Sequence, residues 1–272
     1  MIKRALAAAF LLLAVPQPAA PPFFTSEAAA RDIYFDVPYV ATPPAVVAAM
    51  LNLAKAGPND VVYDLGSGDG RIVIAAARDF KVKKGIGIDL DPDLVTLASK
   101  NAKDAHVSDR VTFARGDIFK MDFKDATILT LYLLPDVNVT LRPRILDLAP
   151  GTRVVSHAFN MGDWVPDGAD NVDMRRVYMW IVPAKVQGVW TAHVNNVPYR
   201  LDLTQRYQNA DGKVRIGAKE TAFEMGIVKS DVFTFTAAGP VTFEGKVAGN
   251  TITGTLTAGG KRTSLTLVRE AP

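Results

Sequence analysis

A glycine-rich segment flanked by acidic side chains is the most chemically informative stretch of the sequence. It reads Asp64-Leu65-Gly66-Ser67-Gly68-Asp69-Gly70 and follows a short apolar run. Glycines in a strand-to-helix turn let the backbone approach a ligand closely, at the sheet edge where α/β folds bind ligands. Dinucleotide-binding loops have the spacing G-x-G-x-x-G and bind a pyrophosphate. The spacing here is G-x-G-x-G, and Asp64 and Asp69 would repel a pyrophosphate. The motif therefore favours a cationic ligand or, alternatively, a tight turn with capping aspartates.

Two further acidic residues follow the next two predicted strands. Asp89 ends the second strand, and Gly116-Asp117-Ile118 come directly after the third. A carboxylate at Asp89 can accept both hydroxyls of a ribose. Its alternative role, capping the next helix, suits Asp91 better. Asp117 can accept a hydrogen bond from an adenine amino group, with Ile118 against the ring. Acids at three successive strand ends therefore predict one ligand site.

Alternating strand-like and helix-like patterns between residues 31 and 183 must position these side chains. Strands are predicted at residues 61–65, 84–90, 111–114, 126–131, 153–156 and 176–182. Helices are predicted from Pro43-Pro44 to Gly57, at 69–78, from Pro92 to Ala102, and at 141–148, with Thr42 as the N-cap of the first. Strands alternating with helices at this spacing predict a parallel sheet with helices on both faces. The strand at 176–182 is expected to be antiparallel at an edge.

The pattern changes from residue 184 to short strands of period-two alternation. Glycine-containing turns such as Asn209-Ala210-Asp211-Gly212 and Ala248-Gly249-Asn250 separate them. This predicts a small antiparallel barrel or sandwich over residues 184–272, and Gly188-Val189-Trp190 resembles the opening of lipocalin-like barrels. Residues 31–183 carry 18 basic and 20 acidic side chains, whereas residues 184–272 carry 11 and 7. The charge step supports a domain boundary near residue 184.

The first 30 residues have the plan of a secretory signal peptide. Lys3 and Arg4 precede an apolar run of 11 residues, Ala5–Val15. That run is too short to span a bilayer alone, and Ala28 and Ala30 fit a cleavage site before Arg31. We therefore expect a periplasmic or secreted protein, with an uncleaved N-terminal membrane anchor as the alternative.

Composition excludes several classes of protein. Of 272 residues, 49% are hydrophobic and 22% are charged, which is typical of globular proteins and excludes a mostly disordered chain. The absence of cysteine excludes disulfides, thiolate zinc sites and cysteine nucleophiles. Three dispersed histidines predict no metal site. An excess of 31 basic over 28 acidic residues is too small to indicate nucleic-acid binding.

Together, Asp64–Gly70, Asp89 and Gly116-Asp117 resemble the cofactor motifs of class I S-adenosylmethionine-dependent methyltransferases, over about residues 39–183. The resemblance is closer to one branch, the protein-lysine methyltransferases that act on ATP synthase subunit c and on the adenine nucleotide translocase. The matching stretches are Pro38–Pro43, Val61–Arg71, Leu131–Pro135, Val155–His157 and Met161–Trp164. The family implies a Rossmann-like seven-stranded sheet with one reversed edge strand. It also implies S-adenosylmethionine as cofactor and an amine acceptor, expected to be a protein lysine.

The resemblance implies a role for each matching residue. Asp64 or Asp69 would lie near the amino group of the cofactor, Asp89 at its ribose, and Asp117 with Ile118 at its adenine. Other residues would line the methionine part (Gly66, Ser67, Gly68), close over the cofactor (Tyr39, Thr42) or lie beside the methyl group (Tyr132). The sequence Tyr132-Leu133-Leu134-Pro135 differs from the N/D-P-P-Y motif of amino-DNA methyltransferases, which argues against DNA bases as acceptors.

The implied reaction is in-line displacement at the sulfonium methyl. A lysine acceptor must first lose its proton, and the neutral amine costs about 4.6 kcal/mol at pH 7. Tyr39, Tyr132 and Trp164 could form an aromatic channel that lowers that pKa by excluding water, and packing in the core is the alternative for each of them. His157 is a candidate general base or, alternatively, a hydrogen-bonded core histidine.

Two other functions stay open at this stage. One is a methyltransferase acting on a small molecule. The other is a non-catalytic envelope binding protein, because an exported enzyme would be separated from cytosolic S-adenosylmethionine. We expect a monomer that can associate with the envelope or a membrane surface.

Overall fold

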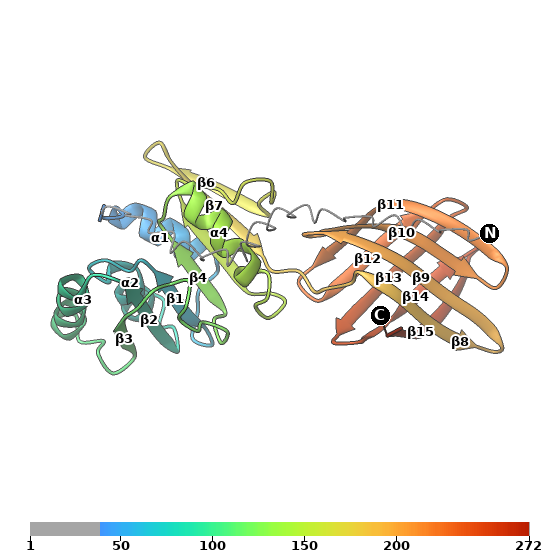
Figure 1. Cartoon of the computed structure of the whole chain (residues 1–272), viewed down its shortest axis with the longest axis horizontal. Helices are drawn as coiled ribbons and strands as arrows, with labels where there is room; N and C mark the ends of the chain where they lie inside the picture. The colour runs from blue at the N-terminus through green and yellow to red at the C-terminus, as the bar shows by residue number, and fades with distance from the viewer. Residues whose placement is uncertain (1–38, 272) are drawn as a thin grey trace, which may run out of the picture. The chain divides into compact units, whose positions relative to one another are not determined.

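The computed structural model describes residues 39–271, so the predicted signal peptide at residues 1–30 lies outside the described residues. The described chain has an α/β part followed by an all-β part (Figure 1). The elements of the α/β part are α1 (Pro44–Leu53), β1 (Val61–Leu65), α2 (Arg71–Asp79), β2 (Lys84–Asp89), α3 (Pro92–Asp104), β3 (Val111–Arg115), β4 (Ile128–Leu131), α4 (Pro135–Ile145), β5 (Arg153–His157), β6 (Gly168–Val172) and β7 (Arg175–Ile181).

The α/β part is built on one seven-stranded sheet in the order β3-β2-β1-β4-β5-β7-β6. The five strands from β3 to β5 pair in parallel, whereas β7 runs antiparallel to β5 and β6 antiparallel to β7. The predicted Rossmann-like sheet is therefore confirmed. The prediction that residues 176–182 form the edge was wrong, because β6 lies outside β7. The sequence pattern does not predict β6, because Gly168–Val172 has no alternation of apolar and polar residues.

Two helices differ from the sequence-based expectation. Pro43, not Thr42, is the N-cap of α1, and its side chain has no atom that could accept a capping hydrogen bond; the Thr42 hydroxyl bonds to His157. Helix α4 begins at Pro135, whose missing N–H suits the first turn, and ends before the predicted residue 148. The helices otherwise follow their apolar spacing, and α1 buries Val46, Val47, Met50 and Leu51 in a core shared with the sheet.

The all-β part is a closed eight-stranded antiparallel barrel, which decides between the predicted barrel and sandwich. Its strands are β8 (Gly188–Val194), β9 (Val197–Arg206), β10 (Asn209–Ile216), β11 (Lys219–Lys229), β12 (Val232–Ala237), β13 (Val241–Ala248), β14 (Thr251–Ala258) and β15 (Lys261–Arg269). Inward-facing apolar side chains fill its interior, among them Trp190 and a group of stacked phenylalanines. The rings of Phe223 and Phe235 are 4.1 Å apart and nearly parallel. Among residues 39–271, no helix is long and apolar enough to cross a membrane.

Candidate active site

The parallel register brings the predicted site residues to one edge of the sheet. Leu65 pairs with Ile88 on one side and with Leu131 on the other. Leu131 in turn pairs with Ser156. The residues that follow these positions therefore line up along the carboxyl edge as Asp89, Gly66, Tyr132 and His157, with Asp117 two residues beyond the end of β3. Sites from residue 64 to residue 157 thus meet in one place, as the sequence predicts.

The glycine-rich loop has a backbone that only glycine adopts easily. Gly66 and Gly68 have φ values of +75° and +52°, in the left-handed region that L side chains avoid. A Cβ on Gly68 would lie 2.5 Å from Cε2 of Tyr39, so the Tyr39 ring packs directly on this loop. Between the glycines, the buried Ser67 Oγ has no hydrogen-bond partner in the described part of the chain. The loop therefore offers a close approach and one unused polar group to a ligand.

Asp64 is a buried carboxylate at the end of β1. It is 2% exposed, and Thr130 Oγ1 donates a hydrogen bond of 2.7 Å to its Oδ1. Burial raises the pKa of Asp64 to about 7, and the nearby negative charges of Asp89 and Asp69 add to the effect, while the Thr130 bond opposes it. A cationic group bound beside Asp64 would relieve the cost of this buried charge.

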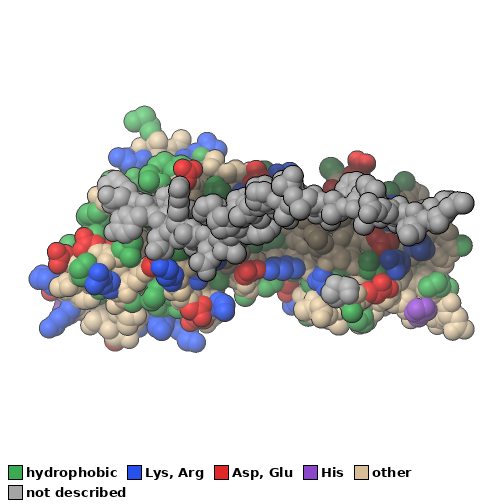
Figure 2. All heavy atoms as spheres, viewed as in Figure 1, with side chains coloured by type: hydrophobic (Ala, Val, Ile, Leu, Met, Phe, Trp, Pro, Cys, Tyr) green, Lys and Arg blue, Asp and Glu red, His purple; other side chains and the backbone are tan. Residues whose placement is uncertain are grey.

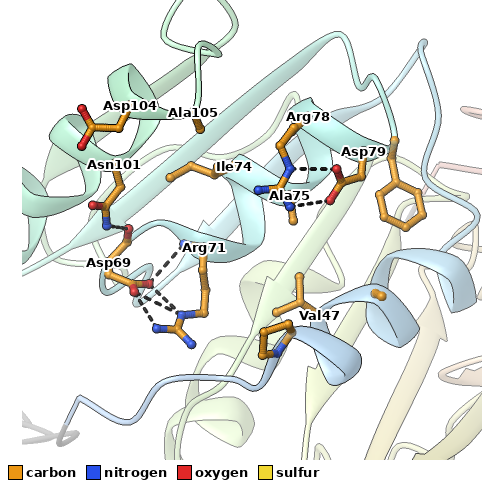
Figure 3. A pocket seen from close by; sticks show the side chains of 13 residues that line it. Val47, Asp69, Arg71, Ile74, Ala75, Arg78, Asp79, Asn101, Asp104 and Ala105 are labelled. Atoms are coloured by element: carbon orange, nitrogen blue, oxygen red, sulfur yellow. Dashed lines mark hydrogen bonds and ion pairs between the residues drawn. The ribbon is translucent and has the colours of Figure 1, made fainter.

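Asp69 has a different environment, because its carboxylate is already paired. Arg71 Nε lies 2.9 Å from Asp69 Oδ1 and Arg71 Nη2 lies 2.6 Å from Oδ2, while Asn101 donates to the Asp69 carbonyl (Figure 3). Burial raises the pKa of Asp69, but the hydrogen bonds and charge of Arg71 outweigh it and hold the pKa below its usual value. Asp69, Arg71 and Asn101 are among the residues that line a groove of about 580 Å³, and the other lining residues come mainly from α1, α2 and α3 (Figure 3). Of the two candidates for the cofactor amino group, Asp64 is the one without a cationic partner among residues 39–271.

Asp91, rather than Asp89, is the N-cap of α3, as the sequence predicts. Asp91 caps α3 by accepting from Asp93 N at 2.8 Å and Leu94 N at 3.5 Å. Asp89 Oδ2 accepts from Gly68 N at 2.7 Å, and its Oδ1 accepts from Asp91 N at 3.0 Å. A carboxylate has about four lone-pair sites, so Asp89 holds the glycine loop and still has acceptor capacity for hydroxyl groups.

Asp117 and Ile118 follow β3 at the same edge. Asp117 Oδ1 accepts from Phe119 N at 2.9 Å, and its Oδ2 lies 3.3 Å from Lys120 Nζ. Ile118 is buried, which provides an apolar surface beside the acid. The pair retains the polar and apolar groups that the adenine role requires, although one carboxylate oxygen is shared with Lys120.

The side of the site beyond Gly66 is aromatic. The ring centroids of Tyr132 and His157 are 3.9 Å apart, and Phe159 stacks on Tyr132 at 6.2 Å. His157 is 1% exposed and shares a hydrogen bond of 3.2 Å with Thr42 Oγ1. Burial, together with the positive charge of Arg175, lowers the pKa of His157 to about 4, so the imidazole is neutral at pH 7. No motif in the sequence indicates Phe159, because only the fold brings its ring to Tyr132.

Trp164 does not line this aromatic surface. It is fully buried, its ring lies 6.0 Å from that of Trp180, and its carbonyl accepts from Trp180 Nε1 at 2.8 Å. It is therefore a packing residue, which decides between its two predicted roles and removes it from the acceptor channel. No cluster of three metal-ligating side chains occurs within residues 39–271.

Comparison with known proteins places this site in a family. The family model of the ANTKMT methyltransferase domain matches residues 64–168. A protein-lysine N-methyltransferase of Saccharolobus islandicus is 42% identical over 151 residues, which make up 54% of this chain and 94% of that protein. The chain belongs to the ANTKMT methyltransferase family. The adenine nucleotide translocase lysine N-methyltransferase of Mus musculus is 37% identical, and the match covers 50% of this chain and 61% of that protein.

A solved structure supports the fold and the cofactor of this ANTKMT-family methyltransferase. It is the crystal structure of an RNA methyltransferase from Salinibacter ruber in complex with S-adenosyl-L-homocysteine. It is 53% identical with a TM-score of 0.53, and the match covers 54% of this chain and 96% of that chain. The cofactor is S-adenosylmethionine, and the described residues of this chain fit it. Among them, Ser67 Oγ is buried without a partner, Asp64 is buried without a cation, and a side chain at Gly68 would collide with Tyr39.

Proposed function

We propose that this methyltransferase transfers a methyl group to the side-chain amine of a protein lysine, and that it does so outside the cytosol. The observation that carries the acceptor assignment is the aromatic cluster in which Tyr132, next to Gly66 at the sheet edge, contacts the rings of His157 and Phe159. The names of the Saccharolobus islandicus and Mus musculus relatives support a lysine acceptor.

Bound S-adenosylmethionine supplies the methyl group on its sulfonium. Asp64 holds the cationic amino group of the cofactor and Asp89 holds its ribose hydroxyls, which fixes the direction from which the acceptor must approach. The acceptor nitrogen forms the new N–CH₃ bond as the S–CH₃ bond breaks, and the ammonium proton leaves to solvent before that step. Aromatic rings around the amine lower its pKa by desolvation, so the chain needs no strong base.

His157 does not accept that proton in the proposed mechanism. A group with a pKa of about 4 is far too weak to deprotonate a lysine ammonium with a reference pKa near 10.4. The neutral imidazole instead packs on Tyr132.

The acceptor is tested by methyl transfer from labelled S-adenosylmethionine into a cell-envelope fraction, followed by mass spectrometry of tryptic peptides. We expect label on lysine side chains when the protein comprising residues 31–272 is added, and at least tenfold less label with its Asp89→Ala variant at the same subsaturating concentration of S-adenosylmethionine. Label that resists protease but is removed by nuclease would instead assign an RNA acceptor, as the name of the Salinibacter ruber relative suggests. Label in small molecules alone would support the small-molecule alternative. Absence of S-adenosylhomocysteine binding at millimolar concentration, measured by calorimetry, would support the non-catalytic alternative.

The charges on the described part of one face favour protein over RNA. RNA-binding surfaces carry a basic stripe or patch. Figure 2 shows Lys and Arg side chains mixed with Asp and Glu side chains over the described part of the face in view. A competition assay with total RNA is expected to leave lysine methylation unchanged.

Export is proposed from the predicted signal peptide at residues 1–30. Fractionation of cells that express the full-length chain with a C-terminal tag tests it. We expect the tag in the periplasm or medium, or in the membrane fraction if the leader stays attached. Recovery in the cytosolic fraction would contradict export and leave the methyltransferase assignment intact.

A further inference from the structure

The first described residues link the cofactor loop to the acceptor side of the site. We call residues 39–42 the strap. At one end the Tyr39 ring packs on Gly68, where a Cβ would lie 2.5 Å from Tyr39 Cε2. At the other end the Thr42 carbonyl accepts from Arg71 Nη1 at 3.0 Å, and Arg71 is paired with Asp69 of the same loop. The strap is therefore fixed to the glycine-rich loop at two points.

The side chain of Thr42 faces the other half of the site. Thr42 is 3% exposed, and its Oγ1 shares a hydrogen bond of 3.2 Å with His157 Nδ1 across 115 residues of sequence. This bond is buried, so neither partner can exchange it for water. The imidazole lies against Tyr132, with ring centroids 3.9 Å apart and planes inclined by 33°.

The contacts form one continuous series, from Gly68 and Asp69 through Arg71 and Thr42 to His157 and then Tyr132. Each link is a hydrogen bond, an ion pair or a ring contact. An uncharged His157 suits such a role, because its burial beside Thr42 creates no unpaired charge. A displacement of about 1 Å at a reacting group can cost about 100-fold in rate, so the position of Tyr132 matters for methyl transfer.

We propose that Thr42 and His157 are positioning residues, which hold the Tyr132 ring at the transfer site only while the strap is seated on the cofactor loop. Cofactor binding at that loop then sets the geometry of the acceptor side. The inference rests on the proposed place of Tyr132 beside the transferred methyl group, and it assigns no proton transfer to His157.

The hydroxyl of Thr42 allows a matched test in the full-length chain. Thr42→Val removes the hydrogen bond at nearly constant volume, whereas Thr42→Ser keeps it. With the envelope fraction as acceptor, we expect Thr42→Val to lower kcat about tenfold while the Kd of S-adenosylhomocysteine stays within about twofold. Thr42→Ser should restore kcat. Thr140→Val, on the exposed side of α4, is the control and should behave as wild type.

A second readout needs no acceptor. In protein labelled with [ε-¹³C]tyrosine, the Tyr132 resonance is assigned by Tyr132→Phe and followed while S-adenosylhomocysteine is added. We expect it to shift in wild type and in Thr42→Ser, and to respond less in Thr42→Val at equal saturation. His157→Phe should have the same effect, and the double variant Thr42→Val/His157→Phe should be no worse than either alone.

Two results would overturn the inference. One is an unchanged Tyr132 response in Thr42→Val, and the other is equal loss in Thr42→Val and Thr42→Ser. A wild-type protein that couples S-adenosylhomocysteine to Tyr132 but methylates no lysine would contradict the proposed function alone.

Discussion

Asp64 shows how one buried residue can make cofactor binding depend on pH. Its pKa of about 7 follows from burial with a single neutral partner, Thr130. A bound ammonium group favours the ionised form, so protonation below pH 7 weakens binding. We expect the affinity for S-adenosylhomocysteine to fall about tenfold from pH 8 to pH 6. Calorimetry at these two pH values measures it, and the Asp64→Asn variant should bind weakly with no such dependence.

Stability provides the control for that variant. Asp64 has a folded pKa raised from 3.8 to about 7, so the native state holds this proton more tightly than the unfolded chain. Below about pH 4 Asp64 is protonated in both the folded and the unfolded state, so it does not lower the free energy of unfolding. Between about pH 4 and pH 7 the free energy of unfolding decreases as the pH rises, because the unfolded chain releases this proton more readily than the folded protein does. Asp64→Asn should therefore melt higher than wild type at pH 8, and by less at pH 5. A lower melting temperature at pH 8 would show that the variant is misfolded rather than defective in binding.

Two neighbouring aspartates separate ligand binding from helix capping. Asp89→Ala should weaken S-adenosylhomocysteine binding at least tenfold, because it removes the ribose acceptor and the bond to Gly68 N. Asp91→Ala removes the N-cap of α3 and should cost about 1 kcal/mol of stability, with binding almost unchanged. Calorimetry and thermal denaturation of both variants check this. Equal binding by Asp89→Ala and wild type would contradict the ribose assignment.

At the scale of elements, the strap packs on the glycine loop without room for a further side chain. Gly68→Ala places a methyl group into the Tyr39 ring on a backbone with φ of +52°, so the variant should lose both stability and S-adenosylhomocysteine affinity. Gly57→Ala is the control, since a Cβ there has no neighbour within 4 Å. Melting temperature and Kd are measured for both. If Gly68→Ala binds as tightly as wild type, the strap does not press on the loop in solution.

The sequence predicts the helices, strands and site residues that are marked by a pattern of neighbouring residues. The glycine motif and the acids at three strand ends predict the cofactor side of the site. They do so because residues that follow the ends of paired parallel strands become neighbours at one edge of the sheet. The acceptor side depends on contacts that no local pattern records. Thr42 matches an N-cap by type yet bonds to a residue 115 positions away. Trp164 matches a channel aromatic yet packs on Trp180. Strand β6 is polar and exposed, so periodicity could not reveal it.

At the scale of the whole molecule, the barrel is a second, separately packed core. Phe235 stacks between Phe223 and Phe243, at 4.1 and 5.5 Å. Phe235→Ala should destabilise the barrel by about 3–5 kcal/mol and leave S-adenosylhomocysteine affinity unchanged. Thr236→Ala, at the exposed neighbouring position, should change stability by less than about 0.5 kcal/mol. Calorimetric unfolding without ligand measures the stability of each variant, and the change in unfolding on addition of S-adenosylhomocysteine measures its affinity for this ligand. A loss of affinity in Phe235→Ala would mean that the barrel supports the cofactor site.

The first and last strands of the barrel are hydrogen-bonded neighbours, with Trp190 opposite Arg269 and Thr191 opposite Val268. The chain therefore enters and leaves this module at almost the same point. Such a domain is suited to circular permutation. Its two ends can be joined by a short linker, and the chain can be reopened at an exposed hairpin turn such as Gly259-Gly260. The order of neighbouring strands in the barrel stays the same. The same geometry suits the barrel to insertion within a surface loop of another protein, because its two ends span only a short distance of the host chain.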